Sequence, residues 1–142
     1  MKTTTGGVCA AKGFTAAGLH AGVKASSAPD KNDLMLLVSE RPCAAWGMYT
    51  KNAVKAASVL LTMEHLKNGT AQAIVANSGN ANACCDGSLE NAARMARCAA
   101  KALGVAEDDV AVGSTGVIGQ TINIAAIEKA SRKARLSLSL FN

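Results

Sequence analysis

The apolar run at residues 110–112 and the glycine-rich turn after it constrain the fold more than any other feature of the chain. Val-Ala-Val leads directly into Gly-Ser-Thr-Gly-Val-Ile-Gly at residues 113–119, and a helix-like segment follows. A strand that ends in such a turn brings backbone N–H groups to the surface without bulky side chains to shield them. Such groups can hold an anion or a developing oxyanion. The sequence therefore predicts a strand, a turn suited to negative charge, and a helix.

The residue types in the turn limit the kinds of site that it could form. The turn lacks the lysine and the glycine spacing of a P-loop and contains no G-x-G-x-x-G, so a phosphate cradle is not indicated. Thr115 supplies one well-placed hydroxyl. From the residues alone, an oxyanion hole and a tight packing turn are equally open interpretations. The chain offers no convincing nucleophile that could act together with an oxyanion hole.

The hydrophobic pattern predicts one domain with a mixed α/β fold, built in α/β or α+β layers. Strands are expected at residues 34–38, 43–50, 58–61, 73–76 and 110–113. Helices are expected at residues 63–67, 89–103 and 122–134. The first two strands could pair as a hairpin through residues 39–42. Because 49% of the residues are hydrophobic but only 3% are aromatic, the core must consist mainly of Ala, Val, Leu and Ile.

Two of the expected helices carry recognisable end signals. Thr62 is placed to act as the N-cap of the helix over residues 63–67. The helix over residues 89–103 has an apolar face that runs from Leu89 to Leu103, and Gly104 is a natural stop for it. Arginine and lysine occupy its other face.

A cluster of asparagines follows the expected strand at residues 73–76. Residues 77–82 read Asn-Ser-Gly-Asn-Ala-Asn. One interpretation is a site for a polar, uncharged ligand or a structural water, since sites are often built at strand ends. The favoured interpretation is a turn in which the asparagine side chains bond to their own backbone.

Other classes of site have little support in the sequence. Cys84 and Cys85 would need a histidine base, and nothing pairs either of them with His20 or His65. No His, Cys and carboxylate spacing fits a metal site, and the acidic residues 107–109 are expected to form a solvated turn before a strand. The net charge of +5 favours anionic partners in general. However, the cations are scattered and aromatic residues are scarce, which argues against nucleic-acid binding.

The composition also indicates where the protein works. Five cysteines, an odd count without C-x-x-C, suggest a reducing compartment and use as small core residues. No stretch is long enough to span a membrane, and residues 1–10 resemble neither a signal nor a transit peptide. The expected location is the cytoplasm.

Four segments, taken together and in order, resemble ornithine acetyltransferase, the bifunctional glutamate N-acetyltransferase family of arginine biosynthesis. They are Cys-Ala-Ala-Lys-Gly-Phe at residues 9–14, Lys-Asn-Ala-Val-Lys-Ala-Ala at 51–57, Ala-Ile-Val-Ala-Asn-Ser-Gly-Asn-Ala-Asn-Ala at 73–83, and Ser-Thr-Gly-Val-Ile-Gly at 114–119. The likeness covers roughly residues 8–129. It marks residues 1–130 as an N-terminal, α-chain-like domain and residues 131–142 as a divergent tail.

The resemblance implies a layered α/β sandwich and a precursor that cleaves itself into α and β chains. The new N-terminal threonine of the β chain takes an acetyl group from N-acetylornithine and passes it to glutamate through an acyl-enzyme. No cofactor is required, although some members accept acetyl-CoA as donor. The oxyanion hole carries over to Thr115 and Gly116. A heterotetramer or a higher oligomer is the expected assembly.

This chain departs from the family pattern in what it lacks. The family's nucleophilic threonine, its substrate-binding lysine and its catalytic carboxylate lie beyond the matched region, so the chain alone is expected to be inactive. Within the tail at residues 132–142, leucine alternates with serine over residues 136–140, and the tail is interpreted as an orphan strand or an out-of-frame end. The alternative function is a truncated, catalytically inactive binding or assembly module.

Overall fold

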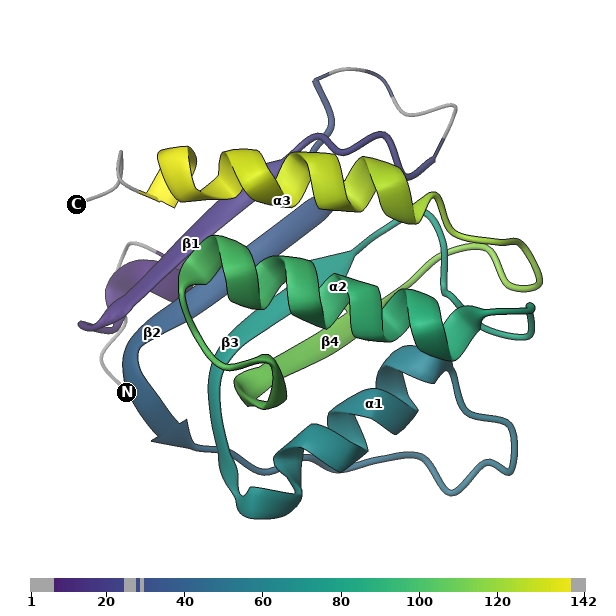
Figure 1. The fold of residues 1–142 in the computed structure, drawn as a ribbon, viewed down its shortest axis with the longest axis horizontal. Coiled ribbons are helices and arrows are strands. Elements are labelled where there is room, and N and C mark those ends of the chain that lie inside the picture. The colour runs from purple at the N-terminus through teal and green to yellow at the C-terminus, as the bar shows by residue number, and fades with distance from the viewer. Residues whose placement is uncertain (1–6, 25–27, 29, 139–142) are drawn as a thin grey trace.

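The computed structural model describes residues 7–24, 28 and 30–138, which form a mixed β-sheet with helices on one side (Figure 1). The strands are β1 Phe14–Leu19, β2 Leu34–Ala44, β3 Thr70–Asn77 and β4 Val110–Ser114. The helices are α1 Ala57–His65, α2 Ser88–Leu103 and α3 Ile124–Leu138. Short 3-10 turns occupy Gly7–Ala10, Leu66–Asn68 and Glu107–Asp109. This architecture confirms the predicted α/β class and the acidic turn before β4.

The sheet topology brings two chain segments to one edge. The strand order is β1-β2-β3-β4, with β1, β2 and β3 antiparallel and β4 parallel to β3. α2 supplies the crossover that a parallel pair requires. Asn77 at the end of β3 pairs with Ser114 at the end of β4. The loops that follow these two strands therefore start side by side, toward the right of Figure 1.

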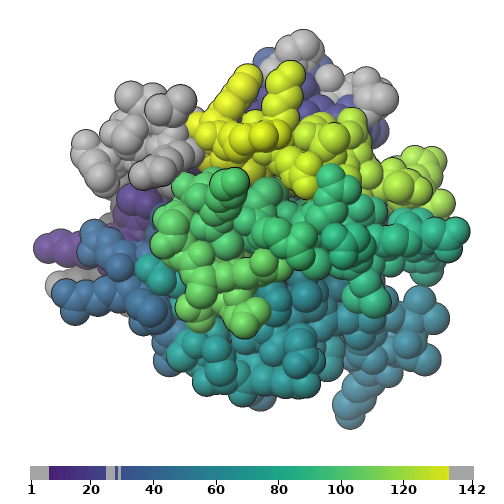
Figure 2. Space-filling model, viewed as in Figure 1, coloured from purple at the N-terminus to yellow at the C-terminus, as the bar shows by residue number. Residues whose placement is uncertain are grey.

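The core lies between the sheet and the helices. Leu36, Val75 and Val112 of the sheet form one buried cluster with Met95 of α2 and Ile127 of α3. Small aliphatic side chains fill most of the rest, as the low aromatic content predicts. Figure 2 shows that α1, α2 and α3 cover this face of the molecule.

The helix predicted over residues 89–103 is confirmed as α2, and it ends where expected. Gly104 has a positive φ of 74° and donates its N–H to Ala100 O over 2.8 Å. The expectation that Leu89 joins the buried face is wrong, because it stands in the first turn of the helix and is 56% exposed. The buried stripe begins at Asn91 and Ala92.

The predicted hairpin between residues 34–38 and 43–50 is wrong. β2 is a single strand that continues through both segments to Ala44, and residues 45–50 lie outside any strand. Between Val38 and Cys43 its register with β3 shifts, so the intervening residues bulge out of the ladder. Pro42 has no N–H to donate and is tolerated at such an irregularity. The sequence break at Pro42 therefore marks a bulge and not a turn.

α1 also differs from its prediction. Residues 58–61 are helical and not extended, and Thr62 lies inside the helix and does not cap it. Its Oγ1 donates to Val112 O over 2.9 Å and accepts the N–H of Val112 over 2.8 Å. His65 Nδ1 donates to Val110 O over 2.8 Å. α1 thereby satisfies both backbone groups of Val112 and the carbonyl of Val110 on the edge strand β4.

The last helix is longer than its prediction. The helix expected over residues 122–134 is confirmed as α3, which begins at Ile124. It continues to Leu138, so the interpretation of the leucine and serine alternation as a strand is wrong over residues 136–138, and residues 139–142 lie outside the described part. An established helix adds further residues at low cost, and Arg-Lys-Ala-Arg at 132–135 are all good helix formers. α3 passes residues 130 and 131 without a break, and a domain division there stays a prediction.

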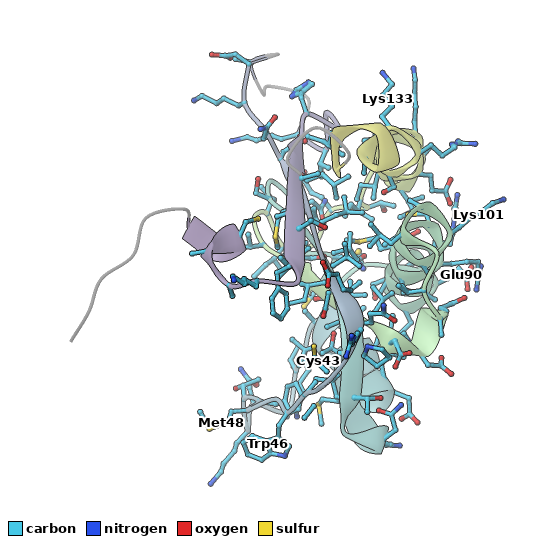
Figure 3. The ribbon with its side chains drawn as sticks, turned by 90° about the vertical axis from the view of Figure 1, so that its left-hand side faces the viewer. Cys43, Trp46, Met48, Glu90, Lys101 and Lys133 are labelled. Carbon is cyan, nitrogen blue, oxygen red and sulfur yellow. The ribbon has the colours of Figure 1, made fainter. Side chains whose placement is uncertain are left out.

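The other face of the sheet has no described α-helix over it. Leu36 and Val75 face the helices, so their neighbours Leu37 and Ile74, which are paired across β2 and β3, face the other way. A hollow of about 220 Å³ includes both residues. Figure 3 shows Trp46 and Met48 on the side of the sheet opposite the labelled residues of α2 and α3.

Candidate functional site

The candidate site is the junction of the loop after β3 and the turn after β4. Thr115 N–H donates to Asn77 O over 3.0 Å, and Val117 N–H donates to Gly79 O over 3.3 Å. Asn80 forms isolated β-bridges with both Thr115 and Val117. Two motifs that are separated by about 35 residues in the sequence therefore form one backbone-bonded unit.

The asparagine side chains of the loop are buried and mostly bonded to backbone. Asn77 Nδ2 donates to Asn80 O over 2.9 Å, and Asn80 Oδ1 accepts Asn82 N–H over 2.7 Å. These bonds confirm the favoured interpretation that the loop caps itself. Asn82 Nδ2 reaches further, to Ser88 O at 2.8 Å in the first turn of α2. Asn77 Oδ1 and Asn82 Oδ1 are buried and have no hydrogen-bond partner among the described residues.

The turn is less open than the sequence suggests. Of its N–H groups, that of Thr115 donates to the carbonyl oxygen of Asn77 at the end of β3, and those of Val117 and Gly119 donate to carbonyl oxygens of the loop after β3, at residues 79 and 83. Within the described part of the chain, Gly116 N–H and the Thr115 hydroxyl make no hydrogen bond. Both residues are exposed. The two groups assigned to an oxyanion hole are thus free to bind a ligand, whereas the flanking amides hold the turn in place.

Gly116 is required by the close approach of the two segments. Its φ is +135°, and a Cβ there would collide with the backbone of Gly79 and Asn80. Any side chain at residue 116 would push the turn away from the loop. The packing interpretation of the turn is therefore confirmed for this glycine, and its part in an oxyanion hole stays a prediction.

The other candidate residues are not brought together. His20 Nδ1 bonds to Lys31 O and His65 Nδ1 bonds to Val110 O, each over 2.8 Å, so neither ring pairs with a cysteine. All five cysteines are free. The expectation that they serve as core residues is wrong for Cys9 and Cys84, which are exposed, whereas Cys98 is partly buried and packs against the core. No metal-binding group of three His, Cys or carboxylate residues occurs within the described ranges.

Sequence reasoning missed a charged groove between α2 and α3. It encloses about 710 Å³, and Glu90, Arg94, Arg97, Lys101, Glu128 and Arg132 contribute to its lining. Arg94 Nε donates to Glu128 Oε1 over 2.8 Å. This bond lowers the pKa of the Glu128 carboxyl and raises the pKa of the Arg94 guanidinium. The cationic face of α2 was the only hint of this groove in the sequence. The residues that complete the groove lie on α3, some 30 residues later, where no local pattern connects them to α2.

Comparison with solved structures places this architecture in a known class. A chain from Bacillus halodurans described as arginine biosynthesis bifunctional protein argJ superposes with a TM-score of 0.80 at 39% identity, over 87% of this chain and 63% of that one. Ornithine acetyltransferase from Mycobacterium tuberculosis, solved in complex with ornithine, gives a TM-score of 0.82 at 38% identity, over 89% and 68%. The fold is that of the bifunctional proteins of arginine biosynthesis.

The family follows from the sequence. The profile of the ArgJ family matches residues 15–140, and the chain belongs to this family. An arginine biosynthesis bifunctional protein ArgJ from Symbiobacterium thermophilum is 48% identical over 140 residues, which are 98% of this chain and 35% of that protein. One from Caldanaerobacter subterraneus is 46% identical over 98% and 34%. The chain spans about a third of the length of these relatives, at their N-terminal end.

No described helix has both the length and the apolar character needed to cross a membrane.

Proposed function

We propose that this chain takes part in arginine biosynthesis as one portion of an enzyme that transfers an acetyl group from N-acetylornithine to glutamate. Membership of the ArgJ family supports the pathway. The similar protein from Mycobacterium tuberculosis is an ornithine acetyltransferase and was solved with ornithine, which supports the substrate class. With five free cysteines in the chain, we place the enzyme in the reducing cytoplasm.

The role that we assign to this chain is the oxyanion hole. The observation that carries it is the pair of donors, the Thr115 hydroxyl and the Gly116 N–H, that make no hydrogen bond within the described part of the chain, on a turn held by the amides of Thr115, Val117 and Gly119. When a nucleophile attacks the acetyl carbonyl, the oxygen gains a negative charge in the tetrahedral intermediate. Donors that are fixed before the reaction stabilise this charge without reorganising. A turn that is tied to a buried loop meets that requirement.

The nucleophile in this proposal is the N-terminal threonine of a second polypeptide that the same precursor releases. Its hydroxyl oxygen attacks the acetyl carbon of N-acetylornithine, and ornithine leaves with its amine protonated. The amine of glutamate then attacks the acetyl-threonine ester and regenerates the hydroxyl. The cycle needs no metal or other cofactor, and acetyl-CoA as an alternative donor is left open.

The exposed apolar residues on the uncovered face of the sheet support the proposal that a partner chain binds there. Trp46 is 83% exposed and Met48 is 87% exposed, and both lie on that side, as do Leu37 and Ile74. Exposed apolar surface of this kind usually marks an interface. Beyond the region that matches this chain, each of these relatives contains further sequence about twice as long as the chain itself. We assign this face to the threonine-bearing β chain, within a heterotetramer or a higher oligomer.

Substitution of Thr115 tests the proposed role. In the enzyme assembled with its β chain, Thr115→Val removes the hydroxyl at nearly constant volume. We expect the rate of acetyl transfer from N-acetylornithine to glutamate to fall about 100- to 1000-fold. Thr115→Ser, which keeps the hydroxyl, should retain most of the rate. An unchanged rate in Thr115→Val, with the assembly intact by size-exclusion chromatography, would remove Thr115 from the oxyanion hole.

A further inference from the structure

We propose that Asn80 is a positioning residue that clamps the turn at residues 114–120 and so fixes the two oxyanion donors. The inference rests on the proposed function, because it assigns Asn80 a part in the same reaction. Asn80 does not itself provide a free donor to the site. Its effect on the reaction would come through the placement of Thr115 and Gly116.

Backbone contacts around Asn80 join the loop to the turn. Asn80 bridges to Thr115 and to Val117, and the neighbouring Ala81 N–H donates to Val117 O over 2.9 Å. The Cβ position of Gly116 lies against the backbone of residue 80 itself. The main chain at Asn80 is thus the surface on which the centre of the turn rests.

The side chain of Asn80 fastens the far end of the turn. Its Nδ2 donates to Gln120 O over 3.0 Å, while Oδ1 accepts Asn82 N–H over 2.7 Å. The residue is only 6% exposed. Since Thr115 N–H is bonded to Asn77 O, the turn is held at its start by the end of β3 and at its finish by the Asn80 amide.

The composition of the turn explains why a clamp is needed. Residues 113–119 include three glycines, and residues 115–120 are exposed. Glycine has more backbone freedom to lose than any other residue, so an unrestrained segment of this kind would move. Oxyanion donors stabilise the transition state only when they are held in position. An Asn is suited to the clamp because its side chain donates at one atom and accepts at the other.

Hydrogen exchange in this chain tests the clamp without reference to activity. Asn80→Asp keeps the acceptor for Asn82 N–H but loses the donor to Gln120 O. We expect the amides of Val117 and Gly119 to exchange about tenfold faster, while amides of β3 and β4 keep their protection and show that the fold is intact. The control is Asn123→Asp, which adds the same charge three residues beyond Gln120 at an exposed position. It should leave the turn unchanged.

Asn80→Ala provides a second variant in case a buried carboxylate unfolds the chain. It removes both side-chain bonds without adding charge, and the same acceleration in the turn is expected. Unchanged exchange at Val117 and Gly119 in the folded variant would overturn the clamp.

Kinetics of the assembled enzyme test whether the clamp acts through Thr115. Asn80→Asp should lower kcat about 10- to 100-fold and change KM little. The Asn80→Asp substitution should slow the Thr115→Val enzyme by a smaller factor than it slows the wild type, because only the Gly116 N–H then remains to be positioned. Fully additive effects would overturn the positioning role and leave the proposed function standing. An unchanged rate in Thr115→Val would instead remove Thr115 from the proposed oxyanion hole, whereas the exchange result would still decide whether Asn80 clamps the turn.

Discussion

Gly116 shows how one absent side chain determines the geometry of the site. The turn rests directly on the backbone of Gly79 and Asn80 at this position, and the neighbouring donors can be fixed only because nothing intervenes. Gly119, in the same turn, also has a positive φ of 78°, but a Cβ there would meet no atom within 4 Å. A comparison of the two positions therefore separates the effect of a steric clash from the effect of an unfavourable backbone conformation.

This contrast gives a stability prediction at the residue scale. Gly116→Ala should lower the free energy of unfolding by about 2–4 kcal/mol, because the Cβ must displace backbone as well as adopt an unfavourable φ. Gly119→Ala, the control, should cost only about 1–2 kcal/mol, since it adds strain alone. Urea unfolding of the two variants measures both values. Equal losses would show that the turn does not rest on the loop as described.

Individual site residues could be found from the sequence only in part. The Ser-Thr-Gly turn and its resemblance to ornithine acetyltransferase led to Thr115 and Gly116 as oxyanion donors, and their role stays a prediction. Which amides are occupied could not be predicted, because their acceptors at Asn77 and Gly79 belong to a loop some 35 residues earlier. Long-range pairing of this kind leaves no local pattern.

At the scale of elements, α1 is held to the sheet by a hydroxyl. Thr62 Oγ1 bonds to both the N–H and the carbonyl of Val112, on the outer edge of β4. Without this helix, the edge strand would present unpaired backbone groups. α1 and β4 are therefore coupled, and β4 leads directly into the turn of the candidate site.

Substitution of Thr62 tests this coupling. Thr62→Val keeps the shape but leaves the two backbone groups of Val112 unsatisfied, and should cost about 1–3 kcal/mol of unfolding free energy. Thr62→Ser should cost less, because the hydroxyl remains. Thermal or urea unfolding distinguishes the two. If valine proved as stable as the wild type, the bonds to Val112 would contribute nothing to the docking of α1.

The ion pair between Arg94 of α2 and Glu128 of α3 gives a pH dependence at this scale. The pKa of the Glu128 carboxyl is lowered in the folded chain, chiefly by the hydrogen bond from Arg94. The unfolded state therefore takes up the proton first as pH falls. The stabilisation is fully present above the unfolded value, about 4.3, and is lost as pH falls through the lower folded value.

Glu128→Gln should therefore destabilise the chain slightly at pH 7 and less at pH 3, as measured by urea unfolding at both pH values. The effect is small because the pair is partly exposed. In an Arg94→Gln background the same substitution should have almost no effect at either pH. A penalty that stays constant from pH 7 to pH 3 would show that this carboxylate is not stabilised by folding.

Sequence patterns located most elements but misplaced those governed by distant contacts. The helices over residues 88–103 and 124–138 have strong periodicity and were predicted near their true positions. The run at residues 58–61 carries no decisive period, and it becomes helical where Thr62 and His65 meet β4. The leucine and serine alternation of the tail suggested a strand, but the helix that begins at Ile124 continues into it.

At the scale of the whole molecule, the two faces of the sheet differ. Helices cover one face (Figure 2), and their outer surface is charged, as Glu90, Lys101 and Lys133 in Figure 3 show. The other face presents Trp46 and Met48. The predicted α/β layering accounts for the covered face. The uncovered one could not be anticipated, because strand patterns do not reveal which neighbours a longer protein supplies.

We propose that this chain provides one part of an acetyltransferase whose nucleophile lies on another polypeptide. The most direct test is the intact mass of the protein purified in its native state, with acetyl transfer from N-acetylornithine to glutamate measured on the same sample. We expect a second polypeptide that begins with threonine, together with transfer activity. A lone chain of 14.4 kDa without transfer activity would contradict the claim.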